Sequence, residues 1–196
     1  MRYYFAAAVC VAVVLVSVPA FASLPYYNQE LGYTIWLSDG WAEAPDVFLS
    51  GYAHLDDGVA GHMAGWEAGY TLTGSGRASL LVTQLHGRVI SKASIGNFNQ
   101  FVVRQLKRAS HEDHSGNRPG VVCLNRASFD SRKNMLRLEM DTADRSGKKM
   151  TSVVYIVYTN GCMLKFVGLA EPGDVQSVAA IDAAVSSLYL DYGLRQ

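Results

Sequence analysis

The densest group of metal-capable side chains is a four-residue run, HEDH, that begins at His111 and ends at His114. Imidazole nitrogens and carboxylate oxygens bind zinc and other transition metals, and a three-residue spacing brings two histidines together on a helical turn. A closed zinc site needs about four convergent ligands, and the sequence fixes no third one. Other histidines that could complete a site are His54, His62 and His86. Because the run lies in a polar loop after a predicted helix, we expect His111 and His114 to be solvated, with no bound metal or cofactor.

Catalytic serine and phosphate-binding motifs are absent from the sequence. The string from Gly74 to Gly76 is shorter than a Gly-x-Ser-x-Gly elbow and is typical of a hairpin turn. No Gly-Lys-Ser/Thr follows the glycines between Gly51 and Gly76, so they do not form a phosphate loop. We therefore predict a protein that is not an enzyme.

The stretch from Gly51 to Gly76 combines many glycines with aromatic and polar side chains. These side chains are Tyr52, His54, Asp56, Asp57, His62, Trp66 and Tyr70. Aromatic and polar groups on flexible backbone are typical of binding surfaces. The other interpretation, which we favour, is a long irregular connection that contains one poorly patterned strand, because loops of this length are uncommon unless they are functional or misassigned.

The first 22 residues have the composition of a cleavable signal peptide. Arg2 and the N-terminal amine provide the positive end, and an apolar run follows from Phe5 to Val18. Small residues at Ala20 and Ala22 fit the pattern that signal peptidase accepts. The apolar run is shorter than the roughly 20 helical residues that cross a bilayer, which argues against an uncleaved membrane anchor. We predict a Sec-type signal that is cleaved between Ala22 and Ser23.

Cleavage would leave a single domain at residues 23–196, located in the periplasm or secreted. Its 174 residues suffice for one core. The whole chain carries 17 basic and 17 acidic residues, and only Arg2 lies in the leader, so the mature domain has a formal charge of −1. Such a domain lacks the basic face that nucleic acids require and the basic segments that hold proteins on anionic lipid. We expect no nucleic-acid partner and no stable membrane insertion after cleavage.

Two cysteines remain after removal of the leader, which takes Cys10 with it. Cys123 and Cys162 would close a loop of about 40 residues if bridged, which contributes roughly 3 to 4 kcal/mol in the chain-entropy model. Oxidising compartments allow such a bond. A bridge needs Cα atoms within about 7 Å, and two separately buried thiols are the alternative. The sequence leaves both possibilities open.

The hydrophobic pattern predicts strands, a helix, four consecutive strands and a final helix. Residues 94–109 have the spacing of an amphipathic helix, with Phe98, Phe101, Val102 and Leu106 on one face. The four strands are expected at 121–129, 134–141, 150–158 and 162–169, with an Asn160-Gly161 hairpin that uses positive φ before the last. Residues 45–49 fit a short extended segment, and Asp174 fits the cap of the last helix. This order is α+β, with an antiparallel meander sheet flanked by helices.

The string GYTIWLSDGW, from Gly32 to Trp41, resembles the opening of the PsbP-like family and its bacterial DcrB-type relatives. In that family a short strand runs into a Pro-x-Gly-Trp turn, and Ser38 here replaces the proline. The closing helix also resembles the family's last helix. The residues concerned there are Ile181, Ala184, Val185, Ser187 and Leu188. The resemblance implies a PsbP-like α/β/α sandwich, and Trp41 is expected to plug the core at a strand end.

Members of that family serve mostly as non-catalytic accessory or interaction proteins, and the resemblance transfers no functional residue. We therefore predict an exported accessory protein that binds another envelope protein through a sheet edge, loop or groove. The alternative is a small ligand- or metal-binding periplasmic module that uses His111, His114 or the glycine-rich stretch. The oligomeric state does not follow from the sequence.

Overall fold

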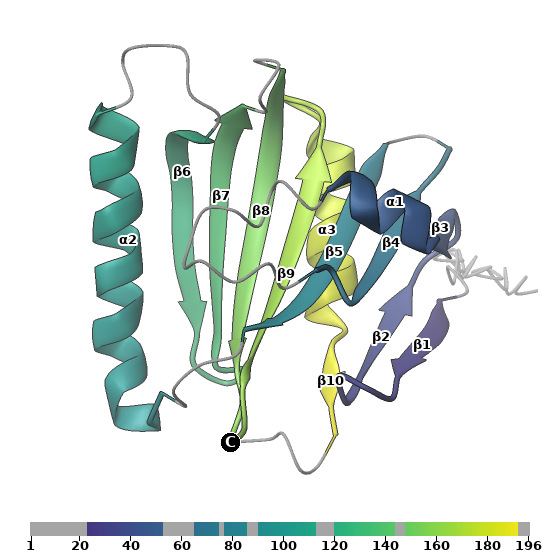
Figure 1. Ribbon diagram of the computed structural model, residues 1–196, viewed down its shortest axis with the longest axis horizontal. Helices are drawn as coiled ribbons and strands as arrows, with labels where there is room; N and C mark the ends of the chain where they lie inside the picture. Colours follow the sequence, from purple (N-terminus) through teal and green to yellow (C-terminus); the bar gives the residue numbers. More distant parts are fainter. Residues whose placement is uncertain are drawn as a thin grey trace, which may run out of the picture.

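A computed structural model of the chain describes residues 23–52, 65–74, 77–85, 90–112, 120–143 and 148–191 (Figure 1). These residues form a seven-stranded antiparallel sheet, a three-stranded sheet and three α-helices. The predicted signal peptide, residues 1–22, lies outside the described residues, and Ser23 is the first residue described. In the described part of the chain, no helix is long and apolar enough to cross a membrane.

The large sheet has the strand order β3-β4-β5-β9-β8-β7-β6, with every neighbouring pair antiparallel. Its strands are β3 (Trp41–Glu43), β4 (Ala68–Leu72), β5 (Ala78–Leu85), β6 (Gly120–Asp130), β7 (Met135–Ala143), β8 (Lys149–Tyr158) and β9 (Met163–Ala170). The four predicted meander strands are β6 to β9, as expected. Because β9 also pairs with β5, it joins the first half of the chain to the meander.

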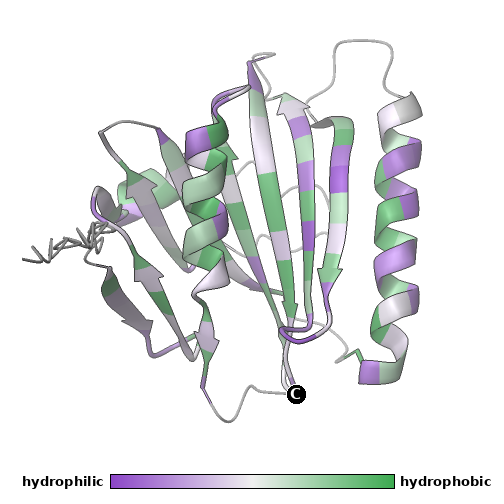
Figure 2. Cartoon of the chain, turned by 180° about the vertical axis from the view of Figure 1, so that it is seen from behind, coloured by the Kyte–Doolittle hydropathy of each residue, from purple (hydrophilic) through white to green (hydrophobic). Residues whose placement is uncertain are grey.

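One face of this sheet, here called the back face, is covered by α3 (Val175–Ser186) and the small sheet (Figure 2). The small sheet has the order β1-β2-β10 and consists of β1 (Leu24–Asn28), β2 (Tyr33–Leu37) and β10 (Tyr189–Leu190). Tyr33, Ile35 and Leu37 alternate inward from β2 and are buried. Trp41 is 6% exposed in the same core, so the expectation that it plugs the core is confirmed.

The opposite, front face is covered by α1 (Asp46–Gly51) and α2 (Ile95–Glu112), with a short 3-10 turn at Lys92–Ser94 before α2. The expectation of an extended segment at residues 45–49 is wrong, because this segment is α1. Pro45 has its φ near −69° at the N-cap and Asp46 lies in the first turn, and both features favour a helix start.

The predicted amphipathic helix is α2, but one of its four expected contact residues points to solvent. Phe101 is 55% exposed, whereas Phe98, Val102 and Leu106 pack on the sheet. Asn99 takes part in the contact instead, since its Oδ1 accepts a hydrogen bond of 2.5 Å from the Tyr158 hydroxyl. The four contact residues, Asn99 included, follow one another at intervals of one, three and four residues, which keeps one helix face toward the sheet.

The β8–β9 hairpin forms at the expected place without positive φ at either turn residue. Thr159 and Cys162 close it: the Thr159 backbone N–H and hydroxyl both donate to the Cys162 carbonyl, at 3.0 and 2.7 Å. Asn134, between β6 and β7, is the non-glycine residue with positive φ in the described chain, at 47°. The predicted backbone conformation of Asn160-Gly161 is therefore wrong, although the hairpin itself is confirmed.

Gly168 in β9 permits the close approach of α3 to the back face. A Cβ atom at this position would lie 2.4 Å from Cγ2 and 2.9 Å from Cδ1 of Ile181, which is fully buried. Asp174 caps α3, as predicted, by accepting a hydrogen bond from the Ser177 backbone N–H. Hydrogen bonds from the Ser177 hydroxyl and backbone lower the pKa of the Asp174 carboxyl. The cap and the glycine together fix where the helix starts and how deeply it sits.

Candidate functional site

The two cysteines of the predicted disulfide are free thiols. Cys123 is aligned with Asp141, and through the neighbouring strands with Thr151 and Ala170, at the end of β9. Cys162 precedes the other end of β9. The two cysteines therefore lie at opposite ends of a strand roughly 25 Å long and three strands apart, well beyond the 7 Å that a bridge allows. The candidate disulfide, which the sequence left open, is therefore excluded; sequence spacing could not decide it because it does not give the direction of the strands that carry the thiols.

Half of the predicted metal-capable run lies beyond what the structure describes. The backbone of His111 belongs to the last turn of α2, so this residue ends a helix rather than lying in a loop. His114 falls outside the described residues, as do residues 53–64, 75 and 76 of the glycine-rich stretch. Within the described ranges, no three His, Cys, Asp or Glu side chains come together to hold a metal ion.

The described part of the glycine-rich stretch contributes instead to a pocket of about 550 Å³ on the front face. Its floor is a row of side chains at one end of four strands. Register places Thr71, Ser79 and Leu169 side by side across β4, β5 and β9, and Met150 of β8 continues the floor. The volume falls within the range of small-molecule sites.

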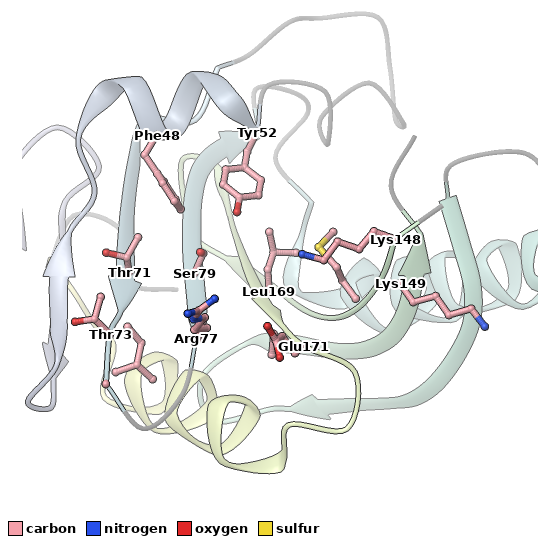
Figure 3. Close-up of a pocket in the computed structure, with 15 residues that line it drawn as sticks. Phe48, Tyr52, Thr71, Thr73, Arg77, Ser79, Lys148, Lys149, Leu169 and Glu171 are labelled. Atoms are coloured by element: carbon pink, nitrogen blue, oxygen red, sulfur yellow. The ribbon is translucent and has the colours of Figure 1, made fainter. Parts of the chain in front are cut away.

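Two aromatic rings form the roof of the pocket, one from α1 and one from the residue that follows it (Figure 3). Phe48 and Tyr52 are four residues apart, and their ring centroids are 5.0 Å apart. Leu49 anchors the helix below them: a Cβ on Gly69 would lie 2.5 Å from its Cδ2, so only glycine leaves room for this contact. The Trp66 indole N–H donates to the Tyr52 carbonyl at 2.9 Å and fixes the end of the helix.

Charged side chains surround the mouth of the pocket where the strands end. Arg77 precedes β5 and Glu171 follows β9, and the antiparallel register makes them cross-strand neighbours. In the described part of the chain neither forms an ion pair. Lys148 extends toward the pocket in Figure 3, whereas Lys149 extends away from it. Arg77, Lys148 and Glu171 therefore line the mouth of the pocket, and Lys148 already has an interaction partner of its own.

Sequence reasoning missed most of this pocket. Arg77, Lys148 and Glu171 are separated by up to 94 residues and follow no motif. The available signal was the position of each residue next to a predicted strand. Arg77 lies where β5 begins, Lys148 lies where β8 begins, and Glu171 lies where β9 ends. Tyr52 was recognised as an aromatic group in the glycine-rich stretch, but its partner Phe48 was assigned to an extended segment.

A polar network on the back face joins α3 to the sheet. The Arg137 guanidinium of β7 donates to both Asp182 carboxylate oxygens, at 2.7 and 2.9 Å, and to Glu139 at 2.9 Å. The Tyr155 hydroxyl also donates to Asp182. Burial alone would lower the pKa of Arg137, but the hydrogen bonds to Asp182 and Glu139 outweigh burial and raise it. We interpret this network as structural, since every charged group in it has a partner from the protein.

The β6 edge of the sheet has no second strand partner, and α2 runs alongside it (Figure 1). In the strand order β6 is the last strand, so it pairs with β7 only. Cys123 and each residue from Asn125 to Asp130 are exposed. Two register shifts interrupt the first half of β6, between Val121 and Cys123 and between Leu124 and Arg126. From Arg126 to Asp130 the pairing is regular, which leaves five residues of regular strand at an open edge.

Comparison with solved structures identifies the fold. No family model matches the sequence, and no curated protein does either. The chain is similar to the solution structure of the cyanobacterial PsbP protein CyanoP from Synechocystis sp. PCC 6803, with 12% identity, a TM-score of 0.51, and 89% and 95% of the two chains covered. The chain thus has a PsbP-like fold, as the sequence resemblance implied.

Two further solved structures match with lower TM-scores. LpqN of Mycobacterium tuberculosis, described as involved in cell envelope biogenesis, shares 12% identity at a TM-score of 0.45, with 86% of this chain and 90% of LpqN covered. PA94 of Pseudomonas aeruginosa, of unknown function, shares 13% identity at a TM-score of 0.44, with 85% and 96% covered.

Proposed function

We propose that this PsbP-fold chain is an exported accessory protein of the cell envelope that has no catalytic role and binds another envelope protein along the β6 edge. The leader at residues 1–22 supports export, because it combines a short apolar run with small residues before Ser23. The accessory role is the one that the resemblance to PsbP-like proteins implies. The observation that carries the proposal is the open, regular segment from Arg126 to Asp130.

Exposed strand edges present unpaired backbone N–H and C=O groups, and proteins usually protect them with bulges, short strands or covering elements. The irregular first half of β6 is protected in this way by its register shifts. The segment from Arg126 to Asp130 has no such shift. Its residues are exposed although α2 packs alongside β6, and α3 does not cover them on the back face (Figures 1 and 2). An added strand from a partner would satisfy these backbone groups.

Side chains of this segment differ between the two faces of the sheet. Arg126 and Ser128 lie opposite Glu139 and Arg137 on the back face, where α3 contributes Asp182 nearby. Ala127 and Phe129 lie on the front face, and Phe129 is 41% exposed. A partner strand that alternates polar and apolar residues would match both faces at once, since backbone pairing gives affinity and the side chains give specificity.

Photocrosslinking in intact cells tests this function. A photoreactive residue at Ser128 is compared with one at Val47, which is also exposed, at 83%, but lies on α1. We expect one discrete adduct with an envelope protein from position 128 and none of the same mass from position 47. Equal adducts from both positions, or none from position 128, would contradict binding at this edge. Fractionation of the same cells, with the N-terminal residue determined, tests export separately.

A further inference from the structure

We propose that the outward side of α2 binds the surface of an anionic phospholipid bilayer. This inference does not rest on the partner proposed for β6, because it uses side chains of α2 and needs no strand edge. It rests on the separation of charge along the chain, on the cations of α2, and on an exposed phenylalanine that lies among them.

Acidic and basic residues are separated along the sequence. Residues 23–76 contain seven acidic residues and no lysine or arginine, whereas residues 77–111 contain six basic residues and no acidic one. The acidic residues are Glu30, Asp39, Glu43, Asp46, Asp56, Asp57 and Glu67, and the basic residues are Arg77, Arg88, Lys92, Arg104, Lys107 and Arg108. The next acidic residue, Glu112, lies in the last turn of α2. The sequence-based expectation that no basic segment is present came from the formal charge of −1, in which these two groups largely cancel.

The fold turns this separation along the chain into a separation in space. Both views place α2 at one end of the large sheet and β3 at the other (Figures 1 and 2). In the strand order, α2 lies beside the last strand, β6, and β3 is the first strand. Asp39, Glu43 and Asp46 are exposed in β3 or next to it. An anionic surface therefore attracts the α2 end of the molecule and repels the β3 end, which gives the bound domain a preferred orientation.

Cations occupy the side of α2 that faces away from the sheet. Val102 and Leu106 pack against the sheet, whereas Arg104, Lys107 and Arg108 are exposed. Arg104 and Arg108 are four residues apart, so they are neighbours on the helix surface. In the described ranges, these three cations form no ion pair with a carboxylate. Their positive charge is therefore available to a partner.

Phe101 lies among these cations. It precedes Arg104 by three residues and Arg108 by seven, so the three side chains share one side of the helix. Phe101 is 55% exposed, although a phenylalanine side chain gains free energy when it leaves water. In a bilayer surface the ring enters the apolar layer below the headgroups, while the guanidinium groups donate to phosphate oxygens. The outward side of a single helix suits such a flat surface, because lipid phosphates need no matching pocket.

Vesicle cosedimentation tests this proposal. The protein is the domain from Ser23 to Gln196, which contains every described residue and lacks the apolar leader. The vesicles are phosphatidylcholine alone or phosphatidylcholine with about 30% phosphatidylglycerol. At about 0.1 M salt we expect at least tenfold tighter binding to the anionic vesicles, with release at about 1 M salt, where the screening length falls to about 3 Å. Equal binding to both vesicles, or no binding to the anionic ones, would overturn the proposal.

Substitutions on α2 locate the binding surface. Arg108→Gln should weaken vesicle binding about fivefold and the double variant with Arg104→Gln about 25-fold, since each basic residue near anionic lipid contributes about fivefold. Phe101→Ala should weaken it about threefold. These side chains are exposed, so the urea midpoint should stay that of the wild type. Arg132→Gln, in the turn between β6 and β7, is the matched control, because Arg132 is also exposed. If it weakens binding as much as Arg108→Gln, the assignment to α2 is wrong.

An acidic protein is the other class of partner for a cationic helix, and polyglutamate is its probe. Polyglutamate offers negative charge without an apolar layer, so Phe101→Ala should weaken binding to anionic vesicles and leave binding to polyglutamate unchanged. If the domain binds polyglutamate but not the anionic vesicles, α2 recognises acidic protein and the bilayer proposal is overturned.

Discussion

Replacing Gly168 by alanine tests how α3 is docked on the sheet. The new Cβ would lie 2.4 Å from Cγ2 of Ile181, whereas carbon atoms in contact are normally about 3.5 to 4.0 Å apart. Ile181 is fully buried and β-branched, so it has no free rotamer to move into. Overpacking of this kind costs about 1 to 3 kcal/mol. A loss of about 2 kcal/mol lowers the Tm of a domain of this size by about 4 to 8 °C.

Thermal and urea unfolding of four variants measure this effect. Ile181→Ala removes all three atoms that the new Cβ approaches, so Gly168→Ala should cost less than about 0.5 kcal/mol when added to it. Gly96→Ala is the matched control: nothing lies within 4 Å of its Cβ position on α2, and it should stabilise the domain by about 0.5 to 1 kcal/mol. If Gly168→Ala is as stable as the wild type, the described position of α3 is wrong.

Three further outcomes follow from the described contacts. Asp182→Asn removes one of the two charged partners of the half-buried Arg137 and should lower the free energy of unfolding by about 1 to 3 kcal/mol; an unchanged urea midpoint would contradict the network. Burial raises the pKa of three tyrosines in the folded protein far above 10. Their contribution to the stability of the fold is therefore complete below pH 10 and is lost as the pH rises beyond it. These tyrosines are Tyr33, Tyr155 and Tyr158. Stability should fall by about 4 kcal/mol per pH unit between pH 10.5 and 12, and a flat alkaline profile would refute their burial. Cys123 and Cys162 should both react with a thiol reagent after denaturation without reductant, whereas a single bridged species would contradict the free thiols.

Local pattern was sufficient to predict much of the fold. The alternation of Leu136 and Leu138 with Arg137 and Glu139 places the first pair on the front face and the second on the back face, as the structure has them. The side-chain period of a strand gives this information directly. The cap at Asp174 could also be predicted from local sequence, because it depends on three consecutive peptide units.

Contacts between distant segments could not be predicted from local pattern. The sequence could not decide whether Cys123 and Cys162 are bridged, because the direction of four strands decides which ends meet. The pocket escaped prediction for the same reason, since Arg77 and Glu171 become neighbours only through pairing of β5 with β9. Phe101 has the spacing of the helix face that packs on the sheet. The shape of the sheet surface beneath α2 decides which residues make contact, and Asn99 does so in place of Phe101.

The most direct test of the central claim, strand addition at β6, is amide hydrogen exchange of Arg126 to Asp130 with and without the crosslinked partner. In an edge strand, alternate backbone groups face outward, so an added strand protects every second amide of the segment while the others already bond to β7. We predict exchange slowed at least tenfold at alternate residues of this segment. Unchanged exchange there, with protection appearing on another element instead, would contradict the account.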